Sequence, residues 1–121
     1  MTRPTRQEQA RAILERRAWK LASHVLGRRA TNASDFAEAF NLERIDLLAE
    51  IPDTASMLAL GRNVVGPRDG LYVLDDGGVY RVYLQEKGES YYETRGTFDE
   101  ARNAVIDRLI QLGGIPLEVE G

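Results

Sequence analysis

The last third of the chain constrains the fold most strongly, because strand and turn signals alternate there at short spacing. The sequence predicts three antiparallel strands, at residues 70–75, 79–86 and 90–95. Two hairpin turns join them, Asp75-Asp76-Gly77-Gly78 and Lys87-Gly88-Glu89, because glycine and aspartate tolerate the positive φ angles of tight turns. Thr97 and Glu100 have the spacing of a capping box and predict a helix over residues 98–112. This part is therefore expected to be a three-stranded antiparallel sheet with a C-terminal helix packed on it.

The first half of the chain is predicted to be helical. Apolar residues recur at steps of three and four, and the expected helices lie at 5–26, 35–40, 42–50 and 57–62. Trp19 lies off the centre of the first apolar stripe, which predicts a place at the edge of the core. We expect an α+β fold in one domain, 1–121, in which a part of two to four helices (1–63) precedes the β-β-β-α part (70–121).

Composition excludes several classes of function. The chain has no cysteine and one histidine, His24, so disulfides, thiolate zinc sites and a catalytic zinc centre are not expected. It contains neither a Gly-x-Ser-x-Gly elbow nor a phosphate-binding glycine motif. We therefore expect no enzyme, no metal and no cofactor. No apolar run is long enough for a bilayer and the N-terminus lacks a secretory pattern, which predicts a cytoplasmic protein without membrane contact.

Charge is distributed unevenly along the chain. Residues 1–29 hold eight basic and two acidic residues, a net +6, whereas residues 30–121 hold eight basic and seventeen acidic residues, a net −9. The basic N-terminal segment either lies against the chain's own acidic part or meets an external polyanion. The second alternative is a nucleic-acid-associated regulator that uses Arg11, Arg16 and Arg17, although nucleic acid is not the partner we expect.

The predicted strands also propose a binding surface. All five tyrosines lie in them, and strand alternation places Arg81, Tyr83 and Gln85 opposite a core face of Tyr80, Val82 and Leu84. On the third strand we expect Tyr91, Glu93 and Arg95 outside and Tyr92 and Thr94 inside, unless a bulge exchanges the two tyrosines. Tyrosine and arginine are enriched at binding hot spots. The candidate partner-binding residues are Asp75, Asp76, Arg81, Tyr83, Gln85, Glu86, Tyr91, Glu93 and Arg95.

Three short motifs of this part resemble small bacterial immunity proteins. They are Tyr80-Arg81-Val82-Tyr83, the turn Glu86-Lys87-Gly88, and the helix start Phe98-Asp99-Glu100-Ala101, which is one residue shorter than the family pattern. The resemblance is confined to residues 70–88 and 98–109. It implies a cytosolic antitoxin that binds and occludes a cognate secreted toxin with a basic active-site surface and catalyses nothing itself. A small ligand-binding domain is a further alternative.

Overall fold

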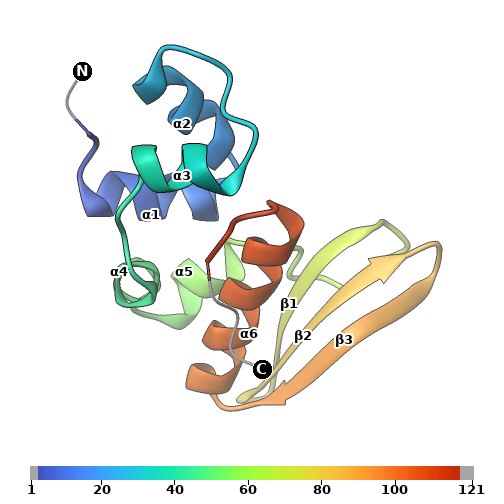
Figure 1. Ribbon diagram of the computed structural model, residues 1–121. Coiled ribbons are helices and arrows are strands. Elements are labelled where there is room, and N and C mark those ends of the chain that lie inside the picture. The colour runs from blue at the N-terminus through green and yellow to red at the C-terminus, as the bar shows by residue number, and fades with distance from the viewer. Residues whose placement is uncertain (1–2, 118–121) are drawn as a thin grey trace. The chain divides into compact units, whose positions relative to one another are not determined.

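In the computed structural model, which describes residues 3–117, the chain forms two compact units (Figure 1). The helical unit contains the described residues up to Glu50 together with those from Leu109 onward, and the sheet unit is Ile51–Arg108. The α+β class, with helices before a three-stranded antiparallel sheet and a last helix, is confirmed. The division between the units falls near residue 50, however, rather than in the loop at 64–69 where the composition changes.

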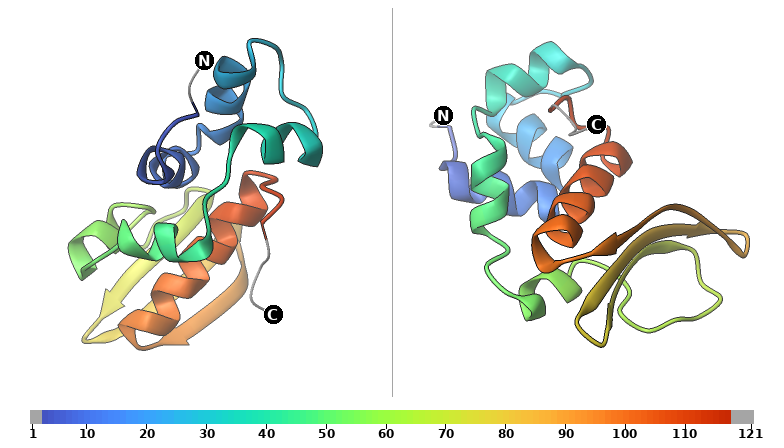
Figure 2. Two further views of the ribbon diagram at one scale, coloured as in Figure 1. Left: turned by 60° about the vertical axis from the view of Figure 1, so that its left-hand side comes forward. Right: turned by 90° about the horizontal axis from the view of Figure 1, so that it is seen from below.

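The helical unit is built from four helices and the end of a fifth. These are α1 (Arg6–Leu14), α2 (Ala18–Leu26), α3 (Ala33–Ala39), α4 (Arg44–Ala49) and the last residues of α6 (Phe98–Leu112). Helix α1 packs against α2 and α4, and α2 packs against α3 (Figure 2). Ile13, Phe36 and Leu47 are buried, so the apolar stripes seen in the sequence do form this core.

The single helix expected over residues 5–26 is divided in two, so within residues 3–117 five helices rather than two to four precede the sheet. Helix α1 ends in a Schellman motif, in which Arg16 N donates to Ile13 O (3.1 Å) and Arg17 N donates to Ala12 O (2.8 Å). Arg16 occupies the left-handed position of this motif, with φ of 61°. The prediction was wrong here because the position carries arginine instead of the glycine that normally signals such an end.

Hydrogen bonds and ion pairs fix the loops of the helical unit. The buried Gln9 donates to Pro4 O and Asn41 Oδ1 and accepts from the N–H groups of Asn41 and Leu42, at 2.8 to 2.9 Å. Such a side chain is costly to bury unless its polar atoms are paired, as they are here.

Asp35 holds the loop between α2 and α3 in the same way. It accepts hydrogen bonds from Thr31 N (2.9 Å) and Arg28 Nη1 (2.7 Å). These bonds, that from the Thr31 backbone first, lower the pKa of the Asp35 carboxyl below its ordinary value.

The sheet unit contains α5 (Thr54–Leu58), three strands and most of α6. The strands are β1 (Gly70–Asp76), β2 (Val79–Glu86) and β3 (Glu89–Gly96), antiparallel in the order β1-β2-β3. Gly77 and Gly78 turn the first hairpin with φ of 69° and 93°, and Thr97 and Glu100 form the expected capping box of α6. Local chemistry therefore placed these boundaries correctly.

One face of the sheet, which we call the helix face, lies against the first part of α6 (Figure 1). Tyr80 contacts Phe98 at the start of α6, with ring centroids 6.1 Å apart, and Val82 on the same face is fully buried. Helix α5 packs on β1, and Thr54 hydrogen-bonds the Tyr80 hydroxyl at 2.7 Å. The core face assigned from alternation is therefore the observed one.

Two classes of feature are missing from residues 3–117. No helix there has the length and apolar character needed to cross a membrane. No group of three or more histidine or carboxylate side chains within this range could hold a metal ion.

Candidate protein-binding surface

The face of the sheet opposite α6, which was predicted to be open, is largely covered. The segment 62–69 runs over it, and we call this side the loop face. At Arg62 the segment pairs with the outer edge of β1, where Arg62 N donates to Leu71 O (2.8 Å) and Arg62 O accepts from Val73 N (2.9 Å). The loop thus covers a short part of the β1 edge as well as part of the face.

Tyr83, expected outside, is only 3 % exposed. Its ring stacks on that of Tyr72, with centroids 5.0 Å apart and planes 5° from parallel, and Leu74 completes this small cluster. Burial raises the pKa of the Tyr83 phenol. The tyrosines of this face are therefore a second core, and Tyr83 is not accessible to a partner.

The Gln85 side chain also hydrogen-bonds the loop at 62–69. Its Nε2 donates to Gly66 O (2.8 Å) and Arg68 O (3.0 Å), the same two carbonyls that lie within hydrogen-bond distance of the Tyr72 hydroxyl. Alternation placed Gln85 on this face correctly, but it could not indicate that a distant loop supplies the partners.

A β-bulge separates Tyr91 from the other residues expected beside it. Val82 pairs with Thr94 and Leu84 pairs with Tyr91, so Tyr83 lies opposite two residues, Tyr92 and Glu93, and the register shifts there. Tyr92 absorbs the shift with φ of 56°. Because directly opposite residues share a face, Tyr91 lies on the helix face with Leu84, which corrects its main assignment. The exchange expected from a bulge is met for Tyr91 alone, since Tyr92 contacts Arg108 of α6.

What remains exposed on the loop face is a charged cluster. Glu93 accepts from Arg81 Nη2 at 2.6 Å and from Arg95 Nε at 3.4 Å, and it lies between two arginines that are directly opposite each other on β2 and β3. Hydrogen bonding to Arg81 lowers the pKa of Glu93, and the same bond raises the pKa of Arg81. With one carboxylate shared by two guanidinium groups, the cluster carries a net charge of +1.

The strongest exposed feature of the sheet unit is a group we call the tyrosine patch, made of Glu86, Glu89, Tyr91 and Tyr92. Tyr91 is 44 % exposed and Tyr92 is 65 % exposed, so two large rings stand side by side at the surface. They lie on the β2–β3 hairpin, which curves away from α6 toward its tip (Figure 2). Among the described residues β3 has no strand on its outer side.

Neighbouring groups hold the two rings in place. The Tyr91 hydroxyl donates to Glu89 Oε2 at 2.7 Å, and this hydrogen bond, with smaller contributions from desolvation and the charge of Glu86, raises the pKa of the phenol. The Arg108 guanidinium carbon lies 4.7 Å from the centroid of the Tyr92 ring. Glu86 and Glu89 are directly opposite each other and form no ion pair with the residues that the structure describes. The patch is aromatic, ordered and negatively charged.

The nine candidate residues are therefore not brought together as one surface. Asp75 and Asp76 are exposed at the first hairpin, where Asp75 Oδ1 accepts from Gly78 N (3.0 Å) and serves the turn. Glu86 and Tyr91 belong to the tyrosine patch, and Glu93 and Arg95 lie on the other face of β3. Sequence reasoning missed Tyr92 and Glu89; the two adjacent tyrosines were the available signal, since they allowed a bulge.

The basic N-terminal segment is paired largely within its own unit. Arg6 contacts Glu43 and Asp46, Arg11 contacts Glu50, and Arg28 contacts Asp35 and Glu38, all between 2.6 and 2.9 Å. Over the full sequence the helical unit has nine basic and nine acidic residues, whereas the sheet unit has seven basic and ten acidic residues, a net −3. The net negative charge of the protein belongs to the unit that carries the tyrosine patch.

Comparison with known proteins finds no counterpart: no protein-family model, no curated protein and no solved structure matches this chain.

Proposed function

We propose that this protein is an immunity protein that inhibits a secreted bacterial toxin by binding it through the tyrosine patch of the β2–β3 hairpin. The observation that carries the proposal is the pair of exposed rings, Tyr91 and Tyr92, on an edge strand beside two carboxylates that form no ion pair within residues 3–117. Exposed tyrosines that are already immobilised lose little side-chain entropy on binding, which makes them effective anchors.

Charge supports a basic partner. The carboxylates of Glu86 and Glu89 lie opposite each other at the hairpin end of the strands, an arrangement that destabilises the isolated sheet. A cationic surface docked there would relieve this repulsion. Complementary charge would also speed encounter and make binding salt-dependent. The resemblance of the strand and helix motifs to immunity proteins points to the same class of partner.

The nucleic-acid alternative has less support. Of the three arginines it requires, Arg11 is paired with Glu50 and Arg17 with Glu15, which leaves Arg16 as the one without an ion pair within residues 3–117. Salt-sensitive binding to duplex DNA that is lost in the triple alanine variant would nevertheless favour it.

Co-expression with the secreted protein encoded by the neighbouring gene tests the proposal. We expect the chain to restore growth and to co-elute with the toxin on size exclusion. Tyr91→Ser with Tyr92→Asn should abolish both effects, since the rings are removed while asparagine tolerates the positive φ at position 92. Val65→Ser is the matched control, because Val65 is equally exposed (68 %) in the same unit but lies on the loop. Absence of protection and of a complex would overturn the proposal.

A further inference from the structure

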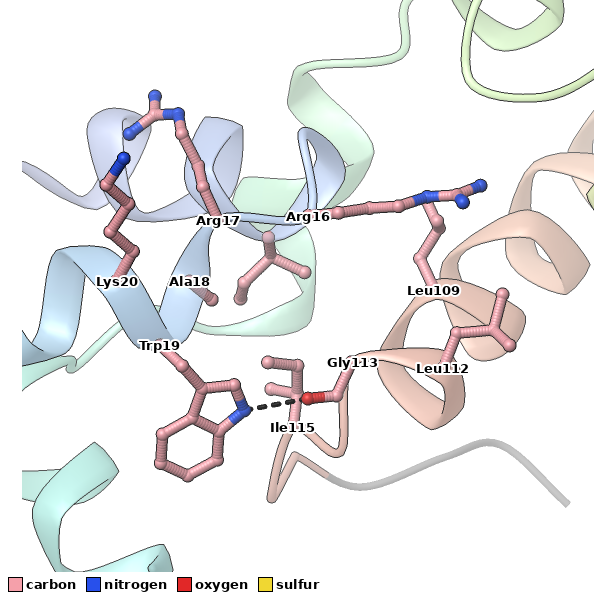
Figure 3. Close-up of a pocket in the computed structure, with 10 residues that line it drawn as sticks. Arg16, Arg17, Ala18, Trp19, Lys20, Leu109, Leu112, Gly113 and Ile115 are labelled. Carbon is pink, nitrogen blue, oxygen red and sulfur yellow. Dashed lines mark hydrogen bonds between the residues drawn. The ribbon is translucent and has the colours of Figure 1, made fainter. Parts of the chain in front are cut away.

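The helical unit contains a hollow of about 430 Å³ where α1 passes into α2 (Figure 3). Its other wall is the last turn of α6 with Gly113 and Ile115. The lining residues are Ile13, Arg16, Arg17, Ala18, Trp19, Lys20, Leu109, Leu112, Gly113 and Ile115. The volume lies in the range of small-molecule sites.

Trp19 forms the apolar wall of this pocket and is positioned by two contacts. Trp19 Nε1 donates to Gly113 O at 2.7 Å, and the indole also contacts Phe36, with centroids 5.7 Å apart. Ile13 and Ile115 are buried beside it, whereas Leu112 is 51 % exposed at the rim. Trp19 thus occupies the expected core edge and presents a fixed aromatic wall to the hollow.

The polar part is entirely cationic. Three of the ten lining residues are basic and none is acidic. Arg17 is paired with Glu15 (2.8 Å), but Arg16 and Lys20 form no ion pair with any residue in the range 3–117. Figure 3 shows the Arg16 side chain extended toward the last turns of α6, while Arg17 and Lys20 point away from the indole.

Arg16 holds this position at a cost in stability. Its φ of 61° is close to that of Gly27, the left-handed glycine that ends α2 with φ of 69°. Glycine at position 16 would remove the strain of a left-handed non-glycine residue. Backbone strain of this kind clusters at functional sites, which favours a role for the Arg16 side chain at the pocket.

We infer that the pocket binds a small organic anion with an apolar body, whose carboxylate or similar group meets Arg16 and whose apolar body lies against Trp19 and Leu112. Three features of the pocket fit this class of ligand. Trp19 provides an apolar wall, Leu112 is exposed and can be covered by the ligand, and the Arg16 guanidinium has no counter-charge within residues 3–117. The site uses residues of the helical unit alone, and it is independent of toxin binding by the tyrosine patch.

Trp19 is the sole tryptophan of the chain, so its fluorescence reports on the pocket directly. We would titrate the whole protein with decanoate and 1-naphthylacetate, using decanol and decyltrimethylammonium as probes of matched length without the negative charge. We expect saturable one-to-one binding of the anions and a rise in Tm, with the uncharged and cationic probes at least about tenfold weaker. Failure of both anions to bind, or equal binding of decanol, would overturn the inference.

Arg16→Gly separates the ligand role from a structural one. We expect this variant to raise the Tm of the free protein by about 3 °C or more and to weaken decanoate binding at least about tenfold. Lys87→Gly is the matched control, since Lys87 also has a positive φ (51°) but lies in the second hairpin turn, and it should leave decanoate affinity unchanged. An Arg16→Gly variant with unchanged affinity would refute the assignment of Arg16, and one with a lower Tm would refute the strain argument.

Discussion

The stacked pair Tyr72 and Tyr83 offers a sharp test of how the loop covers the sheet, because two similar rings differ in what their hydroxyl groups do. The Tyr72 hydroxyl donates to Arg68 O at 2.6 Å and lies 3.0 Å from Gly66 O. The Tyr83 hydroxyl makes no hydrogen bond to the part of the chain that the structure describes, although the residue is buried. Replacing each tyrosine by phenylalanine therefore removes one hydrogen bond in the first case and none in the second.

The expected magnitudes follow from these contacts. Tyr72→Phe should lower the free energy of unfolding by about 1 kcal/mol, the net value of one hydrogen bond, because the Gln85 amide still serves both carbonyls. Tyr83→Phe should change it by less than about 0.5 kcal/mol. Tyr83→Ala, in contrast, empties a buried ring site and should cost about 3–5 kcal/mol.

Urea denaturation followed by circular dichroism measures all three variants, with Tyr92→Asn as an exposed control from the same sheet. Equal losses for the two phenylalanine variants would refute the assignment of the hydrogen bonds. A Tyr83→Ala variant no less stable than the Tyr92→Asn control would refute the covering of the loop face, and it would restore Tyr83 as a candidate contact residue.

Three further changes probe the packing and electrostatics. Gly61→Ala should lower the free energy of unfolding in urea by about 1–3 kcal/mol, because the added Cβ would lie 2.8 Å from a β1 carbonyl oxygen. Gly66→Ala is the control and should cost clearly less, since its nearest atom would lie at 4.0 Å. Equal losses would contradict the close approach of Gly61 to β1. Gln9→Leu should cost at least about 2 kcal/mol by the same assay, since buried N–H groups lose their acceptor, and a neutral result would contradict its role as a loop anchor. The lowered pKa of Asp35 means that its carboxylate stabilises the fold above the unfolded pKa of about 3.9 and that this contribution disappears as pH falls through the lower folded pKa. Asp35→Asn should therefore destabilise the protein at pH 7 but lose this difference in strong acid, and a pH-independent difference would contradict the linkage.

Features that depend on a few adjacent residues could be predicted from the sequence. The turn at Gly77-Gly78 forms as expected, because glycine adopts the positive φ that the turn requires. The capping box of Thr97 and Glu100 also forms, because each side chain bonds the backbone N–H of the other residue, three positions away. The end of α1 also depends on adjacent residues, but it was not predicted, because arginine rarely adopts the left-handed conformation that Arg16 has here.

The accessibility of the candidate site could not be predicted in the same way. Strand alternation correctly separated Val82 from Tyr83, yet it only divides residues between two faces and does not say what covers each face. Tyr83 is buried against Tyr72, whose hydroxyl contacts Gly66 and Arg68 of segment 62–69, and the bulge at Tyr92 moves Tyr91 to the other side of β3.

The amino-acid order by itself determined the α+β class, the strand order and the boundaries of the sheet, since these follow from short-range turn chemistry and hydrophobic period. Tertiary structure alone decided which tyrosines remain exposed and that Trp19, Arg16 and Leu112 meet around one hollow. The physical reason is that burial and pocket formation depend on contacts between segments far apart in the chain, and no local pattern of residue types specifies which distant segment supplies them.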